Sequence, residues 1–203
     1  MRFFKTPFFL PWIFSRREWG FSLEDTSVFL TFDDGPHPAI TPWVLDELAK
    51  SEIKATFFCV GDNVRKHPDI YNRILKEGHR VGNHSMRHEN SSKTNFKKYI
   101  ASYQEANKWI DSDLYRPPYG RLSLRKQNRI LKDKKIIMWS WLAYDFDVSV
   151  STDLILQKAE KQIKKGDILV LHDNPKIKER IKVILPQLIK IIKKKDLSFS
   201  LIK

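Results

Sequence analysis

Two adjacent carboxylates, Asp33 and Asp34, follow an apolar run at residues 28–32 and are followed directly by Gly35 and Pro36. The apolar run predicts a buried strand that ends at glycine and proline, so the two acids are expected at the end of this strand. Adjacent carboxylates repel each other unless a cation or a proton separates them. A metal ion bound by one acid, with the other left as a free base, would remove this repulsion. A surface turn without chemistry is the alternative, because these residue types favour turns.

A pair of histidines forms the second candidate set. His84 and His88 lie four residues apart, directly after Gly82 and Asn83, and this separation predicts two imidazoles on one face of a helical turn. With Asp34 they form a set of two histidines and one carboxylate. Such a set suits Zn²⁺, and also Fe²⁺, Co²⁺ or Mn²⁺, and leaves positions open for water and substrate. Unrelated surface histidines are the alternative.

Three further polar residues, Arg116, Asp145 and His172, also follow proposed strands. The carboxyl ends of the strands in a parallel barrel open on the same face. We therefore expect these residues to share one cleft with the carboxylates and the histidines.

The elements that must position these residues alternate between strands and helices. Strands are expected at 28–32, 55–60, 79–83, 114–116, 136–141, 168–171 and 199–202, and helices at 41–48, 68–77, 95–110, 123–131, 152–163 and 177–194. Apolar strands that alternate with helices indicate a parallel sheet covered by helices. About seven strands favour a distorted (β/α) barrel in a single α/β domain, although the spacing also allows an open doubly wound sheet.

The chain of 203 residues, 41% of them apolar, is long enough for one domain with a substantial core. Residues 1–26 are interpreted as an N-terminal strap and residues 27–203 as the catalytic domain. The first 14 residues contain Pro7 and Pro11, have no small-residue cleavage site and are shorter than the roughly 20 residues of a membrane span. We expect the strap to pack on the domain, with shallow membrane contact as the alternative. The absence of a cleavable signal favours the cytoplasm, and peripheral membrane association is the other possibility.

The net charge of +13 favours an anionic partner such as an anionic membrane or a wall polymer, or else a solvated basic surface. Nucleic acid is not expected, because the lysines are not interleaved with stacking aromatic residues. The basic helix at 177–194 has an apolar stripe that should pack on the barrel, so its role is predicted to be structural. Cys59 is the only cysteine, so no intrachain disulfide can form. Separately, the protein is expected to be a monomer.

Taken together, the motifs resemble a known family, the polysaccharide deacetylases of the nodulation type, also called carbohydrate esterase family four. The resemblance runs from about Val28 to the C-terminus. It rests on five segments in order: Thr31-Phe32-Asp33-Asp34-Gly35, His84-Ser85-Met86-Arg87-His88, Arg116-Pro117-Pro118-Tyr119-Gly120, residues 139–147, and Val170-Leu171-His172. The resemblance implies a distorted (β/α) barrel and metal-dependent hydrolysis of the acetamide of N-acetylated sugars, such as peptidoglycan or chitooligosaccharides.

The resemblance also implies roles for the residues on the metal side of the site. Asp33 would be the general base, held in place by Arg116. Asp34, His84 and His88 would bind one divalent ion, with Zn²⁺ expected first.

On the other side of the site, the resemblance implies that His172 is the general acid and that Asp145 pairs with it. Tyr119 would donate its backbone N–H to the oxyanion. Asp173 is a turn residue in this interpretation, although it is also a rival partner for the His172 imidazole. Val170 replaces the leucine usual in the family.

The fourth motif departs from the family pattern. The family often has two acids and a tryptophan there, whereas this chain keeps only the second acid and has Phe146 in place of the tryptophan. The acetyl pocket would therefore be lined by Phe146, by Trp139 or by Trp141, and the tryptophans could equally be core residues.

The leading functional hypothesis is a metal-dependent N-deacetylase of glycans. An amidase acting on an amide that is not a carbohydrate would use the same site, because function depends on the site and its loops rather than on the fold. A catalytically inactive glycan-binding homologue is the third hypothesis. It is disfavoured because every expected metal ligand and both acid-base groups are present.

Overall fold

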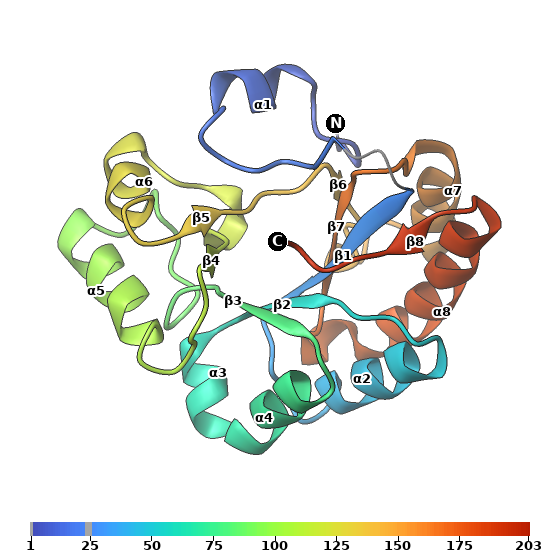
Figure 1. Ribbon diagram of the computed structural model, residues 1–203, viewed down its shortest axis with the longest axis horizontal. Coiled ribbons are helices and arrows are strands. Elements are labelled where there is room, and N and C mark those ends of the chain that lie inside the picture. The colour runs from blue at the N-terminus through green and yellow to red at the C-terminus, as the bar shows by residue number, and fades with distance from the viewer. Residues whose placement is uncertain (1, 23–25) are drawn as a thin grey trace.

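The computed structural model describes residues 2–22 and 26–203. Its strands form one parallel sheet in the order β5-β4-β3-β2-β1-β7-β6, with β8 beside β1. The sheet curls into an incomplete barrel (Figure 1). The strands are β1 (Ser27–Asp33), β2 (Thr56–Cys59), β3 (Arg80–Asn83), β4 (Leu114–Tyr115), β5 (Lys135–Ile136), β6 (Trp141–Leu142), β7 (Ile168–His172) and β8 (Ser198–Phe199).

Helices surround the outside of the barrel, and the short α1 (Phe9–Ile13) lies apart from them at the top of Figure 1. Several helices begin where the sequence predicts. Pro42 and Pro68 lie in the first turns of α2 and α4, and Asn95 and Ser151 accept hydrogen bonds from backbone N–H groups of α5 and α7. The surrounding helices are α2 (Thr41–Lys50), α3 (Gly61–Lys66), α4 (Pro68–Lys76), α5 (Phe96–Ala106), α6 (Leu124–Ile130), α7 (Thr152–Gln162) and α8 (Lys178–Lys194).

Successive side chains of β1 point alternately to the helix-covered core and to the barrel interior. Every residue of β1 is buried, so the strand has no solvent face. Val28, Leu30 and Phe32 belong to the large core that includes residues of the helices. Phe29 packs in a second cluster with Phe58, Leu114, Ile137, Ile168 and Ile202. The chain end that carries Ile202 lies inside the ring of strands in Figure 1. The barrel interior is therefore filled by side chains rather than open.

The N-terminal segment bridges the two free edges of the sheet. On one edge, Thr6 N–H donates to Ser140 O at 2.9 Å and Leu142 N–H donates to Phe4 O at 2.8 Å. On the other edge, Glu18 N–H donates to the carbonyl of residue 136 at 2.8 Å and accepts through its own carbonyl from the N–H of residue 138 at 2.7 Å. The segment thus satisfies backbone groups that β5 and β6 would otherwise leave unpaired, because these two strands do not pair with each other.

The structure confirms the predicted parallel α/β barrel and most of the predicted elements. The prediction of a single strand at 136–141 is wrong, because β5 and β6 lie at opposite edges and the residues between them bond to the N-terminal segment and to β4 and β7. The last strand ends at Phe199 rather than at residue 202, and the sequence analysis missed α1 and α3.

The apolar stripe of α8 packs into the core as predicted, through Ile181, Ile184, Leu188 and Ile192. No helix among residues 2–22 and 26–203 is long and apolar enough to span a bilayer. The strap interpreted at 1–26 includes residues 1 and 23–25, which lie outside the described residues.

Phe4 gives a test of the closure by the N-terminal segment. Its side chain is only 5% exposed and packs against Trp141 and Tyr144, with ring centroids 6.3 and 5.1 Å away. Phe4→Ala should lower the free energy of unfolding by about 3–5 kcal/mol, the usual cost of emptying a buried aromatic site. The control, Phe8→Ala, removes a ring that is 90% exposed and should change stability by less than about 0.5 kcal/mol. Urea denaturation of both variants measures this, and equal stabilities would contradict a structural role for the segment.

Candidate metal centre and active site

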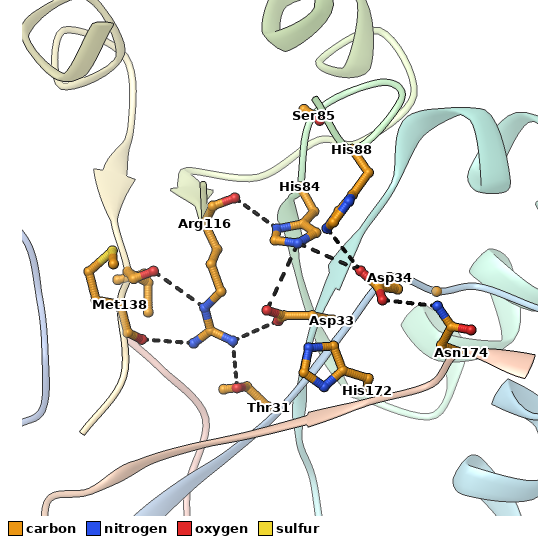
Figure 2. Close-up of polar contacts among 12 residues, drawn as sticks. Thr31, Asp33, Asp34, His84, Ser85, His88, Arg116, Met138, His172 and Asn174 are labelled. Carbon is orange, nitrogen blue, oxygen red and sulfur yellow. Dashed lines mark hydrogen bonds and ion pairs between the residues drawn. The ribbon is translucent and has the colours of Figure 1, made fainter. Parts of the chain in front are cut away.

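The polar residues predicted to converge come together at the carboxyl end of the strands (Figure 2). Asp33 ends β1, Asn83 ends β3 just before His84, and His172 ends β7. Beside them lies a polar groove with a volume of about 460 Å³. The lining residues of this groove include Asp34, Asn63, Lys66, Arg87, His88, Tyr119, Asn174 and Lys176.

Arg116 is completely buried and holds Asp33 from inside the barrel. Its Nη1 donates to Asp33 Oδ1 at 2.7 Å and to Thr31 Oγ1 at 2.6 Å, and the other guanidinium nitrogens donate to the carbonyls of Ile137 and Met138. The guanidinium also lies over the Phe58 ring. Burial lowers the pKa of Arg116 although Asp33 opposes this, and an arginine still remains charged. This charge-assisted hydrogen bond fixes the orientation of the Asp33 carboxylate.

Asp34, His84 and His88 form the cluster expected for a metal ion. Their ligand atoms lie within 4.8 Å of one another. Asp34 Oδ1 lies 3.2 Å from His88 Nε2 and 3.8 Å from His84 Nε2, and it is buried without a hydrogen-bond partner among the described residues. Two ligands about 2.1 Å from one tetrahedral ion lie about 3.4 Å apart. The donor set and the unpartnered carboxylate oxygen therefore fit a divalent ion.

Neighbouring groups set the orientation of His84 and the pKa values of His84 and Asp34. His84 Nδ1 lies 2.8 Å from the carbonyl of Arg116 and donates its hydrogen there, which directs the Nε2 lone pair towards Asp34. Burial lowers the pKa of His84 to about 4, so its imidazole is neutral at physiological pH. Burial raises the pKa of Asp34, but three neighbouring imidazoles and the amide of Asn174 lower it further, so this pKa lies below its ordinary value.

A backbone turn allows both neighbouring carboxylates to face the site. Asp34 has a φ of 86°, in the region that non-glycine residues rarely adopt, and Asn63 Nδ2 donates to its carbonyl at 2.7 Å. Asp173 braces the same turn by accepting from Gly35 N–H at 2.9 Å and from Thr41 Oγ1 at 2.5 Å. A Cβ on Gly35 would lie only 2.0 Å from the Asp173 carboxylate, so the turn requires glycine. Asp173 therefore supports the turn and does not pair with the His172 imidazole.

The predicted histidine pair is brought together, but the predicted helical turn is wrong. Residues 84–88 form a loop in which Ser85 and His88 have φ values of 64° and 56°. Asn83 Oδ1 accepts from Ser85 N–H at 2.7 Å and Ser102 Oγ accepts from Met86 N–H at 3.0 Å. These side chains satisfy backbone groups that helical bonds would otherwise use, so a folded loop produces the same proximity of the two rings.

His172 and Asp145 form a second pair on the other side of Asp33. Asp145 is fully buried, and its two oxygens lie 2.8 Å from Nδ1 and 2.8 Å from the backbone nitrogen of His172. Burial lowers the pKa of His172, but the attraction and hydrogen bond of Asp145 outweigh it and raise this pKa to about 9. The imidazole is therefore protonated at neutral pH and can donate a proton from Nε2.

The aromatic residues of the third and fourth motifs occupy different places. Trp141 is fully buried in the core, and Trp139 packs beneath Gly120 at the barrel interior. Phe146 is 49% exposed, with its ring centroid 5.0 Å from that of His172. Tyr119, with a φ of 59°, places its ring centroid 4.6 Å from that of His88. Phe146 and Tyr119 are thus the aromatic side chains at the mouth of the site.

Comparison with known proteins identifies the family. The polysaccharide deacetylase family model matches residues 22–135. A peptidoglycan-N-acetylglucosamine deacetylase of Bacillus cereus is 32% identical over 192 residues, 89% of this chain and 88% of the relative. The chain belongs to the polysaccharide deacetylase family. A chitooligosaccharide deacetylase of a Bradyrhizobium species is 33% identical to this deacetylase over 176 residues, 81% of the chain and 78% of the relative.

The fold of this deacetylase also matches a solved relative. The crystal structure of a peptidoglycan N-acetylglucosamine deacetylase has a TM-score of 0.80 and 30% identity, with 97% of this chain and 95% of that chain covered. The predicted family, barrel fold and hydrolase class acting on N-acetyl amides are confirmed, and the family is metal-dependent. The family model ends at residue 135, so the arrangement of Asp145 and His172 rests on the structure.

Sequence reasoning missed several groups that shape the site of this deacetylase. Asn174 donates to Asp34 Oδ2 at 3.2 Å, Asn63 holds the Asp34 carbonyl, and Thr31 shares the Arg116 guanidinium with Asp33. Thr31 lies two residues before Asp33 on a strand, which places both side chains on the same face, so its position could have been predicted. Asn63 and Asn174 lie in segments whose paths past Asp34 are set only by the tertiary fold.

The His172 pair makes stability depend on pH in a definite direction. A pKa raised from 6.5 to about 9 stabilises the fold fully below pH 6.5, and this contribution is lost as the pH rises through about 9. In chelator-treated protein the free energy of unfolding should fall by roughly 2–3 kcal/mol across this window. Asp145→Asn should remove most of that fall. Denaturant titrations at several pH values measure it, and an equally steep fall in the variant would rule out this pairing as its cause.

Proposed function

We propose that this deacetylase hydrolyses the acetamide of N-acetylglucosamine units in an oligomeric glycan such as peptidoglycan or a chitooligosaccharide. One observation carries the proposal. Asp33, held by Arg116, and His172, held by Asp145, lie close to one convergent cluster of Asp34 and two histidines. Amide hydrolysis needs a base for the attacking water, an acid for the departing nitrogen and a polarising ion, and this arrangement provides groups for all three.

Asp34, His84 and His88 would hold the ion, with Zn²⁺ expected first from the donor set and Co²⁺, Mn²⁺ or Fe²⁺ as alternatives. When bound, the ion supplies Lewis-acid activation of water and of the amide carbonyl. Asn174 and the Arg116 carbonyl keep two of the ligands oriented. Such outer partners commonly change metal affinity or activity when they are removed.

Asp33 is the proposed general base. Its Oδ2 lies 3.9 Å from His84 Nε2, beside the cluster, while its Oδ1 is bonded to Arg116. One carboxylate oxygen is thus fixed by the guanidinium and the other faces the place where water would be activated. Asp33 therefore accepts the water proton, and Arg116 keeps its carboxylate oriented for this step.

His172 is the proposed general acid, and Asp145 keeps its imidazole protonated and oriented through Nδ1. Nε2 then delivers its proton to the amide nitrogen as the carbon–nitrogen bond breaks. Tyr119 would donate its backbone N–H to the oxygen that becomes negative in the transition state. Phe146, exposed beside His172, would provide an apolar wall for the acetyl methyl group.

The polar groove supports a sugar rather than a small apolar amide as the substrate. It is lined by amide, carboxylate and ammonium groups that can bond hydroxyls, and Tyr119 offers a ring for packing against a sugar face. The names of the two relatives, a peptidoglycan and a chitooligosaccharide deacetylase, agree with this class.

Acetate release tests the reaction and its substrate. Protein loaded with one equivalent of Zn²⁺ is incubated with chitooligosaccharides, with peptidoglycan fragments and with acetanilide as an amide without a sugar. We expect acetate from a glycan only, loss of activity on chelation and recovery on adding metal. Activity confined to acetanilide would indicate an amidase, and protein that binds no metal would indicate an inactive binder. Either result would overturn the proposal.

Two substitutions separate the base from the metal ligand. Asp33→Asn should retain the metal but lose about 10²- to 10⁴-fold in turnover, the usual scale for a general base. Asp34→Asn should weaken metal binding, with activity partly recovered at high metal concentration. Asp46→Asn, a 58% exposed side chain on α2, is the control and should retain both properties. Metal content and turnover are measured together. If Asp33→Asn emptied the site while Asp34→Asn kept it full, the two roles would have to be exchanged.

A further inference from the structure

The outer face of the N-terminal segment carries an unusual concentration of exposed apolar side chains. Thirteen large hydrophobic side chains are exposed among the described residues, and five of them lie within residues 3–13. Phe8 is 90% exposed and Trp12 is 83% exposed, and α1 buries none of its residues. We call Phe8, Phe9, Trp12 and Ile13 the apolar tip. Side chains of this kind gathered on one face mark an interaction surface.

Hydrogen bonds on both sides of the apolar tip anchor it to the domain, although its own side chains are exposed. Before it, Thr6 Oγ1 donates to Trp139 O at 2.7 Å. After it, the buried Arg17 donates to Gln127 Oε1 at 2.6 Å and to Leu122 O at 2.9 Å, and Trp19 Nε1 donates to Phe14 O at 3.2 Å. The apolar tip therefore sits on an anchored support, and Figure 1 shows α1 at the rim of the molecule, in the gap between α6 and α7.

Basic side chains accompany the apolar tip. Residues 2–22 contain four basic residues and a single acid, Glu18. Arg16 is exposed and bonds to the neutral amide of Asn128, while Arg121 shares a surface hollow with Leu10 and Phe14. Neither arginine forms an ion pair with a carboxylate of the described residues. Their charges are thus available to an external anion.

We propose that the apolar tip and its flanking arginines dock this protein onto the surface of an anionic phospholipid bilayer. Tryptophan and phenylalanine favour the boundary between headgroups and acyl chains, and basic residues around them are attracted to anionic headgroups. The position on the fold agrees with such a role, because no residue of the apolar tip lines the polar groove.

Docking would also place the active site near the lipid surface. Tyr144 Oη donates to Phe3 O at 3.4 Å, the Tyr144 and Phe146 ring centroids are 5.8 Å apart, and Phe146 contacts His172. The N-terminal segment and the loop that carries Asp145 are thus direct neighbours. A glycan held at the membrane surface would be within reach of the docked enzyme.

Vesicle sedimentation tests the proposal. We expect the protein to bind phosphatidylcholine vesicles that contain phosphatidylglycerol, and to bind pure phosphatidylcholine much less. The double variant Phe8→Ser, Trp12→Ser should lose about tenfold or more in partitioning, because two interfacial anchors are removed. Arg16→Gln and Arg121→Gln should each lose roughly fivefold. Sedimentation needs no enzyme activity, so the measured partitioning does not depend on the proposed reaction. Turnover on a soluble chitooligosaccharide should remain unchanged in all three variants.

Matched controls distinguish the apolar tip from general charge or hydrophobicity. Lys190→Gln, Lys193→Gln and Lys194→Gln together remove exposed charges of α8, and Trp109→Ser removes a 42% exposed tryptophan outside the apolar tip. Both controls should change partitioning by less than about twofold. The lysines lie on α8, away from α1 in Figure 1, where their attraction to the docked lipid is weakened by salt, and Trp109 is not part of the apolar tip. Undiminished vesicle binding by the double variant would overturn the proposal. So would a dimer in light scattering that becomes a monomer in that variant without any vesicle binding, because the apolar tip would then be a self-association surface.

Discussion

The guanidinium of Arg116 is the group on which the rest of this site depends. It is a fully buried charge whose hydrogen bonds reach Asp33, Thr31 and the carbonyls of residues 137 and 138, while its own carbonyl orients His84. A buried charge is tolerated only when it is paired and its donors are satisfied, and removing one partner commonly costs about 3–5 kcal/mol. Asp33, His84 and the segment between β5 and β6 are therefore coupled through one side chain. A shorter or uncharged residue there would disturb all three together.

Much of the arrangement is visible in the sequence because its signals are local. Continuous apolar runs between helices predict a parallel barrel, and the positions of Asp33, Asp34, His84 and His172 after such runs predict one shared cleft. The expected geometry of the histidine pair was wrong, since spacing alone cannot distinguish a helical turn from a loop closed by side-chain hydrogen bonds.

Other features depend on contacts between distant segments. The apolar run at 136–141 resembles one strand, but its backbone bonds partly to the N-terminal segment, and no local signal reveals that partner. Asp173 gives a similar case. Its neighbour His172 suggested a shared role, whereas the fold directs its carboxylate to Gly35 and Thr41, more than 130 positions earlier in the chain. Long-range pairing of this kind decides which of two plausible partners a side chain adopts.

The position of β1 has a consequence for the order in which the protein can fold. This strand lies between β2 and β7 and also pairs with β8, and Ile202 fills part of the barrel interior from beyond β8. A ribosome makes β1 early and β7 and β8 late, so the central strand emerges with only one of its three neighbours near it in the sequence. Its buried side chains lack their final neighbours until the last segments are made, and until then the strand presents an unpaired edge. Folding during synthesis is thus confined to local helix and strand units, and the barrel closes only after β8 has been translated.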